Sequence, residues 1–580
     1  MPLRLPLLLA VLLAAPASAQ LSGTYTIDDA PGAAADFASL DEAFAALEAV
    51  GVSGEVTLAL EPGLYVGQAD LTGPIAGAGP TARVTVTGPP VAPGAAPLAT
   101  LRYDATVLAD NYVVRLDDVS FVTFRHLGFD ASQGATNLGR AFHITGDVSW
   151  LTFEGNRFRG PGQVAPVGPF LSANVSLLYM YASVDEAPEV IRIARNVFEG
   201  GGNGVHFDFV VGNPVFGYAE RIYVQSNYFI AQEGAAISSR RVRNVVISDN
   251  EMYRVQRGVE LFRHRGGLVT RNQVLSEGIG MSIGQTNQIG SVPTDPEDRF
   301  IMSNNMISSD DVCLNLYVPR YMMIAHNTML STMGVGYKAA FQMGSSYASM
   351  YISEAVKVKG NIVVAGEAQL IEFWGPGLEA SDSNVFYDTD PAGEFGEVYG
   401  VTHTTLADYQ AATGFDAHSL VHPVTFAGFG DLRLAGPSIG DDLLGVSRTS
   451  EVLVDVEFDS RPRWTYAGAD EAGVQIYPPA PRMATSDPTE EPAVSEVSLS
   501  APVPNPSASG ARVAFALPEA GPARLAVHDA RGRELAVLAD GTVGPGRHEV
   551  RLPGDLPAGV YLVRLEAGGT TLTQRAAVVR

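Results

Sequence analysis

One phrase of eight residues recurs through the middle of this chain: apolar, any, apolar, two polar or turn residues, asparagine, any, apolar. One copy runs from Leu151 to Phe158, and later copies contain Asn196, Asn227, Asn250, Asn272, Asn305, Asn327, Asn361 and Asn384. Several copies are 22 or 23 residues apart, and the interval of 33 residues from Asn272 to Asn305 fits the same unit with a loop added. A fixed period of this length predicts a solenoid. Because the unit alternates like a strand and shows no helical period, we expect a solenoid of β-strands.

The asparagines have a physical role in such a stack. Alternate side chains such as Val245 and Ile247 are expected to point into the solenoid, while the asparagine lies at a bend. There its amide can bond to the backbone and to the asparagine of the next coil, about 4.8 Å along the axis. A ladder of stacked amides explains why this residue type returns while its neighbours vary.

The N-terminal end contains the one clear amphipathic helix. Between Asp36 and Leu47, the apolar residues Phe37, Leu40, Phe44 and Leu47 recur at helical spacing. A strand solenoid needs its open end covered, because exposed strand edges invite aggregation. We therefore predict that this helix caps the solenoid.

Regular coils are expected from about residue 80 to about residue 390. Residues 21–475 are predicted to form the solenoid as a whole, with 21–78 as the N-terminal cap region and the less regular residues 390–475 as the C-terminal closing part. Residues 476–496 are rich in Pro, Thr, Ser and Glu without an apolar period, which is typical of a linker. Residues 497–580 contain short alternating strands split by Gly and Pro, which predict a small Ig-like β-sandwich.

Residues 1–20 have the features of a secretory signal peptide. Arg4 stands near the start, an apolar run extends from Leu7 to Ala15, and Ala17-Ser18-Ala19 gives a small-x-small end. We expect the mature chain to begin near residue 21 and the protein to be secreted or displayed on the cell surface. The apolar run is too short to span a bilayer and no later run is long enough, so no transmembrane segment is expected.

Charge and cysteine content restrict the partners. The formal net charge of −25 argues against nucleic acid or an anionic membrane as partner, because either would repel the chain. Cys313 is the single cysteine, so no intramolecular disulfide is available and stability must come from stacking and burial. No thiolate-activating partner can be assigned to Cys313, so we interpret it as a buried wall residue.

The repeat region resembles the right-handed parallel β-helix proteins of the pectate-lyase-like class. The resemblance covers roughly residues 80–475 and rests on the recurring phrase together with the closing Gly468-Ala469-Asp470-Glu471. It implies an all-β, right-handed parallel β-helix, and it favours a protein that binds or degrades polysaccharide. The opening Gly23-Thr24-Tyr25-Thr26-Ile27 looks like the N-terminus of secreted bacteroidete surface proteins of this kind.

The C-terminal domain resembles the type A sorting domain of the type IX secretion system. The matching pieces are 504–507, 528–533, 544–548 and 556–565, with His528 at a position where that family usually has tyrosine. The resemblance implies export across the outer membrane by the type IX machinery, with removal of residues 497–580 and attachment to the cell surface as further expectations. A carbohydrate-binding or adhesive sandwich is the alternative interpretation.

Binding residues of a strand solenoid usually lie on one outward strip and the loops beside it. About ten residues after each asparagine, a further strand of the coil is expected. Its side chains should alternate between inward residues, such as Val205 and Leu261, and outward residues. The outward candidates for catalysis are His206, Asp208, Arg240 and Glu260, followed at the end of a strand by Arg263 and His264. Strand stacking would bring these residues within a few coils of one another.

This set suits two reactions on a sugar chain. A lyase acting on an acidic glycan needs a base, for which His206 or His264 is the candidate, and a cation that neutralises the uronate, for which Arg240 and Arg263 are candidates. A hydrolase needs two carboxylates, and Asp208 with Glu260 is the candidate pair. The simpler interpretation is an exposed sheet with solvated polar residues.

The sequence leaves three classes of function open: a polysaccharide lyase or hydrolase, a non-catalytic glycan-binding or adhesive protein, and a structural surface protein. Fold resemblance alone does not decide between them. No cofactor is indicated. Asp295, Glu297 and Asp298 could hold Ca²⁺ in a loop, although they lack the spacing of a calcium-binding loop. Asp249 and Arg271 occupy equivalent positions in neighbouring coils and are predicted to form an ion pair.

Overall fold

The computed structural model describes two compact units, which divide the chain between Ala480 and Pro481. The described residues are 19–30, 33–92, 95–135, 137–162, 172–182, 188–209, 218–287, 299–332, 339–344, 353–366, 368–374, 377–390, 394–471, 497–500, 502, 511–518, 521–529, 533–543, 546–553, 556–557 and 559–578. The predicted signal peptide, apart from residues 19 and 20, and the predicted linker at 476–496 lie outside these residues.

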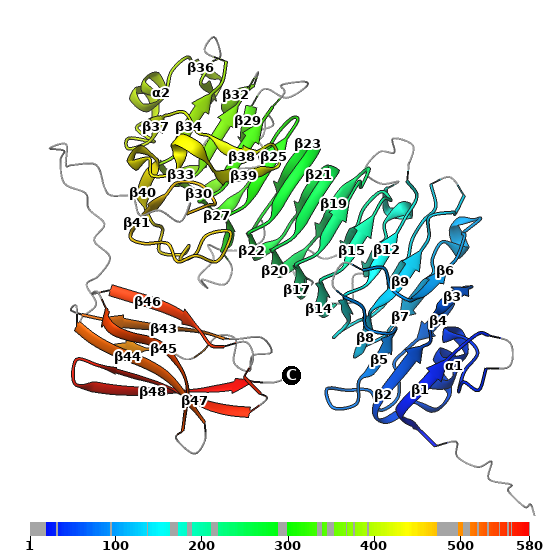
Figure 1. Ribbon diagram of the computed structural model, residues 1–580. Helices are drawn as coiled ribbons and strands as arrows, with labels where there is room; N and C mark the ends of the chain where they lie inside the picture. Colours follow the sequence, from blue (N-terminus) through cyan, green and yellow to red (C-terminus); the bar gives the residue numbers. More distant parts are fainter. Residues whose placement is uncertain are drawn as a thin grey trace, which may run out of the picture. The chain divides into compact units, whose positions relative to one another are not determined.

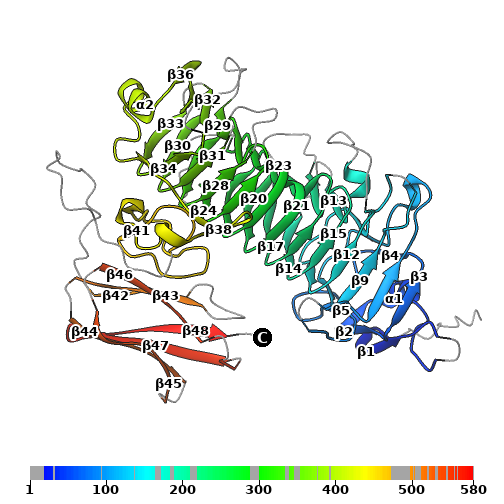
Figure 2. The ribbon, with the colours of Figure 1, turned by 45° about the horizontal axis from the view of Figure 1, so that its top comes forward.

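The first unit is a parallel β-helix, as the sequence predicted. Each coil gives one strand to each of three faces, and the strands of successive coils stack in parallel along one axis (Figures 1 and 2). The first face is a sheet of thirteen strands. Its members are β1 (Leu21–Ile27), β2 (Val52–Leu60), β5 (Val84–Thr87), β8 (Val122–Arg125), β11 (Thr152–Glu154), β14 (Glu189–Ala194), β17 (Ala219–Gln225), β20 (Val242–Ser248), β22 (Arg265–Thr270), β24 (Phe300–Ser303), β27 (Arg320–Ala325), β30 (Glu354–Lys359) and β33 (Leu378–Asp382).

The second face follows the bend occupied by the asparagines. Its strands are β3 (Gly63–Val66), β6 (Ala99–Arg102), β9 (Leu127–Asp130), β12 (Arg157–Arg159), β15 (Val197–Glu199), β18 (Tyr228–Ile230), the first parts of β21 (Glu251–Phe262) and β23 (Gln273–Gly284), β25 (Met306–Ser309), β28 (Thr328–Ser331), β31 (Ile362–Ala365), β34 (Val385–Asp388) and β37 (Leu420–Val421). The long strands β21 and β23 continue without a break into the third face.

The third face completes each coil. Its strands are β4 (Ala69–Thr72), β7 (Val114–Asp117), β10 (Phe142–Thr145), β13 (Leu178–Ala182), β16 (Val205–Phe209), β19 (Ala235–Arg240), the second parts of β21 and β23, β26 (Leu314–Tyr317), β29 (Ala339–Gly344), β32 (Gln369–Trp374) and β35 (Gly396–Val398). At its C-terminal end β36 (Val401–His403) pairs antiparallel with β35, and helix α2 (Leu406–Thr413) follows.

Identical apolar side chains stack on one another inside the coils. Phe129, Phe158, Phe198 and Phe229 come from four successive strands of the second face, and their ring centroids are separated by 5.3, 4.6 and 4.8 Å. All four are buried. These separations match the spacing of neighbouring strands, so each coil repeats the packing of the one before it.

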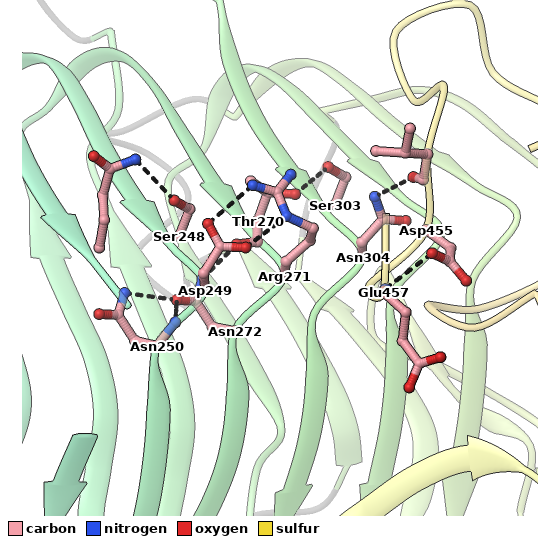
Figure 3. Close-up of polar contacts among 12 residues, drawn as sticks. Ser248, Asp249, Asn250, Thr270, Arg271, Asn272, Ser303, Asn304, Asp455 and Glu457 are labelled. Carbon is pink, nitrogen blue, oxygen red and sulfur yellow. Dashed lines mark hydrogen bonds and ion pairs between the residues drawn. The ribbon is translucent and has the colours of Figure 1, made fainter. Parts of the chain in front are cut away.

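The predicted asparagine ladder is present and is buried throughout. In the central coils the side-chain oxygen of Asn272 accepts from the backbone N–H of Asn250 at 3.2 Å and from its amide nitrogen at 2.9 Å (Figure 3). The amide nitrogen of Asn272 donates in turn to Asn305 Oδ1 at 2.9 Å and to the carbonyl of Ile247 at 3.0 Å. The same bonds connect all nine asparagines from Asn156 to Asn384. The ladder satisfies the backbone at the bends of these nine coils, where strand pairing alone would leave donors open.

Helix α1 (Leu40–Val50) covers the N-terminal end of the solenoid (Figure 1). Ser39 begins it by accepting from the backbone N–H of Glu42 at 3.1 Å, and its buried residues include Leu40, Phe44 and Leu47. The prediction of a capping helix is therefore confirmed. Coiling nevertheless begins before residue 80, because β1 and β2 already pair in parallel within the first face.

Residues 422–471, here called the closing segment, cover the second face at its C-terminal end. They contain β38 (Phe426–Gly428), β39 (Asp431–Leu434), β40 (Gly445–Ser447) and β41 (Trp464–Tyr466). Outward residues of the second face are apolar under this segment: Ile362, Val364 and Val385 are buried against it. The segment therefore removes from water an apolar surface that the solenoid alone would expose.

The closing sequence 468–471 has a specific contact for each residue. Gly468 has φ +82° and passes so close to β28 and β31 that a Cβ would lie 2.5 Å from Thr328 Oγ1. The backbone N–H of Ala469 donates to Thr328 Oγ1 at 2.9 Å, and Asp470 accepts from the backbone N–H of Leu434 at 2.8 Å. Glu471 forms a buried ion pair, at 2.6 Å, with a guanidinium of the same segment. This motif fastens the closing segment to the coils.

The second unit is the predicted small β-sandwich. One sheet consists of β42 (Ser498–Leu499), β43 (Arg512–Leu517) and β46 (Gly546–Arg551). The other consists of β45 (Glu534–Val543), β44 (Gly521–Asp529), β47 (Gly559–Ala567) and β48 (Thr570–Val578), all antiparallel. Val513, Leu525 and Val563 lie in a core of its own, so this unit packs independently of the solenoid. Among the described residues, no helix is both long and apolar enough to cross a membrane.

Candidate functional site

The outward side chains of the third face form two columns, here called the outer strip. Because the strands stack in register, residues far apart in sequence become neighbours. The first column contains, in order, Arg115, His143, Tyr179, His206, Ser238, Glu260, Ser282, Asn315, Gln342 and Glu372. The second column contains Tyr181, Asp208, Arg240, Phe262, Gly284, Tyr317, Gly344 and Trp374. The sequence predicted that His206, Asp208, Arg240 and Glu260 point outward on stacked strands, and the register of the strands agrees with it.

His206 accepts a hydrogen bond at one nitrogen of its ring. Asn203 Oδ1 accepts from the backbone N–H of Ala235 at 2.8 Å, which fixes its amide nitrogen as the group that faces His206 Nδ1 at 3.1 Å. A neutral imidazole that accepts at Nδ1 carries its proton on Nε2. Burial lowers the pKa of His206 to about 4, so the ring is neutral at pH 7. The nitrogen that a base would use is therefore occupied by Asn203.

The two candidate carboxylates each have a guanidinium partner. Asp208 lies 3.5 Å from Arg240 Nη1, and Glu260 lies 3.3 Å from Arg257 Nη1. Asp208 and Glu260 are two coils apart and in different columns. The strip brings them to the same surface but not to neighbouring positions, and their catalytic role stays a prediction.

Arg240 and Arg263 both lie close to one aromatic ring. Their guanidinium carbons are 5.8 and 5.2 Å from the ring centroid of Phe262. Arg263 Nε also donates to Gln285 Oε1 at 2.8 Å. Cations packed in this way against a ring are positioned at the edge of the strip, where they could meet an acidic group of a glycan.

His264 does not belong to the strip, which corrects its selection from the sequence. It is 1% exposed, and its Nε2 lies 3.0 Å from the carbonyl oxygen of Ser239. Burial lowers its pKa to about 4. The preceding residue, Arg263, has φ +59°, and this left-handed conformation at the corner turns the next side chain inward. His264 is therefore a neutral histidine of the core.

Gln342 and Glu372 extend the first column and were not selected from the sequence. Trp374 ends the second column with 37% of its surface exposed. Glu372 stands eleven residues after Asn361, the same offset as Ser238 from Asn227. The signal was therefore present, and extending the count to Asn361 would have found Glu372.

The predicted ion pair between Asp249 and Arg271 is present and lies at the corner beside the ladder. Arg271 Nε and Nη2 donate to the two oxygens of Asp249 at 2.7 and 3.0 Å (Figure 3). The ring of Phe458, from the closing segment, lies 4.3 Å from the guanidinium carbon. The pair is thus a partly covered structural contact. Cys313 is buried, as expected, and burial raises the pKa of its thiol.

A depression of the surface lies on the second face, outside the strip. It has a volume of about 410 Å³ and is lined in part by Ser132, Arg159, Glu199 and Ile230. Arg159 Nε and Glu199 Oε2 are 3.5 Å apart, so the two charges in it face each other. The described residues contain no group of three or more His, Cys, Asp or Glu side chains placed to hold a metal ion. Asp295, Glu297 and Asp298, the calcium candidates, lie outside the described residues.

Comparisons with known proteins give limited likenesses. No family model matches the sequence, and no curated protein matches it. Among solved structures, the GH136 lacto-N-biosidase from Eubacterium ramulus has 11% sequence identity and a TM-score of 0.39, with 69% of this chain and 67% of that chain covered. The catalytic unit of a GH87 α-1,3-glucanase from Streptomyces thermodiastaticus has 12% identity and a TM-score of 0.28, with 72% and 68% covered.

Proposed function

We propose that this protein binds polysaccharide along the outer strip. The observation on which the proposal rests is the composition of the two columns. They combine hydroxyl, amide and carboxylate groups with aromatic rings over ten coils, a length of more than about 40 Å. Sugar chains are bound by polar groups that pair with hydroxyls and by rings that stack on sugar faces. A straight strip of this length suits an extended chain.

A replacement in the middle of the strip tests the proposal. Ser282 stands between Glu260 and Asn315 in the first column. The substitution Ser282→Trp places a large side chain across the path of the glycan. We expect it to weaken retention on an immobilised polysaccharide by at least about tenfold, which corresponds to about 1.4 kcal/mol.

The matched control carries the same change on another face. Thr123 is a partly exposed residue of β8 on the first face, so Thr123→Trp should leave retention unchanged. Soluble acidic and neutral glycans compared by affinity electrophoresis supply the measurement. Retention of none of them by the wild type, or equal losses in both variants, would count against the strip.

The contacts described above weaken the case for a lyase and leave the case for a glycan-binding protein unchanged. A lyase acting on an acidic glycan would use His206 as base, but Asn203 occupies its Nδ1, and His264 is enclosed in the core. Arg240 and Arg263 still offer charge neutralisation for a uronate. The non-catalytic alternative, a glycan-binding or adhesive protein, needs only the strip itself. New unsaturated ends after incubation would indicate a lyase, and retention without cleavage would indicate a binder.

We further propose that residues 497–580 direct export through the type IX secretion machinery and that the mature protein is secreted or surface-displayed. The support is the sequence resemblance together with the independent packing of the sandwich, which lets a sorting module act without disturbing the solenoid. Expression of the chain with and without residues 497–580 in a host with this machinery tests it. The full chain should reach the cell exterior, and the truncated chain should stay in the periplasm.

A further inference from the structure

Aromatic residues recur at every second coil of the second column, in the C-terminal half of the outer strip. Phe262 of β21, Tyr317 of β26 and Trp374 of β32 alternate with two glycines, Gly284 of β23 and Gly344 of β29. The strands that carry them pair in register throughout. Two strand spacings are about 9.6 Å, so the three aromatic positions follow one another at this interval along the axis.

Glycine keeps side chains out of the positions between the rings. A Cβ at Gly284 would lie 3.0 Å from Cδ2 of Phe262, which shows that this ring leans toward the glycine. Gly344 has φ +106°, a conformation that other residues rarely adopt, and a Cβ there would lie 2.1 Å from the carbonyl oxygen of Trp374. Successive rings of the column are therefore separated by backbone alone.

The three rings reach the surface. Trp374 is 37% exposed, and Phe262 and Tyr317 are partly exposed. The guanidinium groups of Arg240 and Arg263 approach Phe262 and mark the N-terminal end of the series. Large rings placed in one line across a sheet form an apolar track on which the faces of sugars can stack.

The first column supplies uncharged hydrogen-bonding groups beside this track. Ser282, Asn315 and Gln342 stand on three consecutive coils, and the first two of these side chains are partly exposed. In these three coils the outward positions of both columns hold only uncharged residues. The hydroxyls of a sugar find hydrogen-bond donors and acceptors there, whereas an acidic sugar would find no cation to neutralise it.

We propose that the strip binds a neutral β-1,4-linked polysaccharide whose alternate sugars stack on Phe262, Tyr317 and Trp374. The inference rests on the proposed function and adds the linkage class of the glycan. In a β-1,4-linked chain of pyranoses each sugar is flipped relative to the one before it, so the same face recurs at every second sugar. One sugar of such an extended chain is close in length to one strand spacing, so rings at every second coil meet equivalent faces. The polar column, present at every coil, meets the hydroxyls of every sugar.

Calorimetric titration of the full chain with β-1,4-linked gluco- and xylo-oligosaccharides of increasing length tests the proposal. Because the series from Phe262 to Trp374 spans five coils, we expect the affinity to rise up to about five sugars and then to level off. Tyr317→Ala and Trp374→Ala should each weaken the binding of the longer oligosaccharides by about tenfold. In Trp374→Ala the affinity should level off at about three sugars, a shift that a merely structural effect would not produce.

Tyr317→Phe keeps the ring and should retain most of the affinity. Tyr253→Ala is the matched control, because Tyr253 is a tyrosine of the second face with 46% of its surface exposed, and its loss should leave binding unchanged. A preference for α-linked, β-1,3-linked or acidic glycans overturns the inference and leaves the binding proposal intact. Undiminished binding by Tyr317→Ala and Trp374→Ala also overturns it. Absence of binding for every glycan contradicts the proposed function itself.

Discussion

Replacing Asn272 by alanine should lower the free energy of unfolding of the solenoid by about 3–5 kcal/mol, because several buried groups lose their partners together. Asn272 Oδ1 accepts two bonds from Asn250, and its amide nitrogen donates to Asn305 Oδ1 and to the carbonyl of Ile247. Alanine leaves these donors and acceptors in a site where Asn272 is 0% exposed. Each unsatisfied buried group costs about 1–3 kcal/mol.

Chemical denaturation of the full chain, followed by far-ultraviolet circular dichroism, gives the measurement. Asn315→Ala is the control, since Asn315 is a partly exposed residue of the outer strip and should cost less than about 1 kcal/mol. Solenoids transmit stability between neighbouring repeats, so hydrogen exchange should increase first in the coils next to Asn272. A loss no larger than that of the control would show that strand stacking alone maintains the bends.

Replacing Arg461 by methionine should destabilise the closing segment by a similar amount, about 3–5 kcal/mol. Arg461 is fully buried, and its Nη1 donates to Glu471 at 2.6 Å while its Nη2 donates to Asn304 Oδ1 at 3.0 Å and to the carbonyl of Gly468 at 2.7 Å. Burial raises the pKa of Glu471 to about 7, and Arg461 acts in the opposite direction. Removing the cation leaves a buried carboxylate without its partner.

The expected readout is faster proteolysis within residues 422–471 and increased binding of a hydrophobic dye, because the apolar residues of the second face become exposed. The double variant Arg461→Met/Glu471→Met should recover part of the loss, since the unpaired charge is then absent. Arg433→Met removes a half-exposed guanidinium of the same segment, which pairs with Asp431, and should cost less than about 1 kcal/mol. Equal effects at positions 461 and 433 would refute this account.

The sequence predicts the fold well because a single residue type marks nine successive coils. Once the asparagines are aligned, the side-chain alternation of strands places His206, Ser238 and Glu260 on one outward column, as the register shows. This success needs only the strand period and the stacking rule. The capping helix follows from its own 3.6-residue period.

The parts that escaped prediction depend on corners and on irregular chain. His264 turns inward because of the left-handed conformation at Arg263, which strand alternation does not encode. Gln342 stands fifteen residues after Asn327, compared with ten for Glu260 after Asn250, so a fixed offset misses it. The outward apolar residues Ile362 and Val364 become interpretable only once the closing segment is seen to cover them.

Because of the amide ladder, the rise of each coil along the axis does not depend on the number of residues in that coil. The 40 residues between Asn156 and Asn196 and the 22 residues between Asn250 and Asn272 each advance the stack by one coil. The strand spacing along the axis is therefore unchanged by the additional residues. A scaffold with this property can acquire, exchange or lose surface loops without refolding, and foreign peptides inserted between consecutive asparagines would be displayed at intervals set by the ladder.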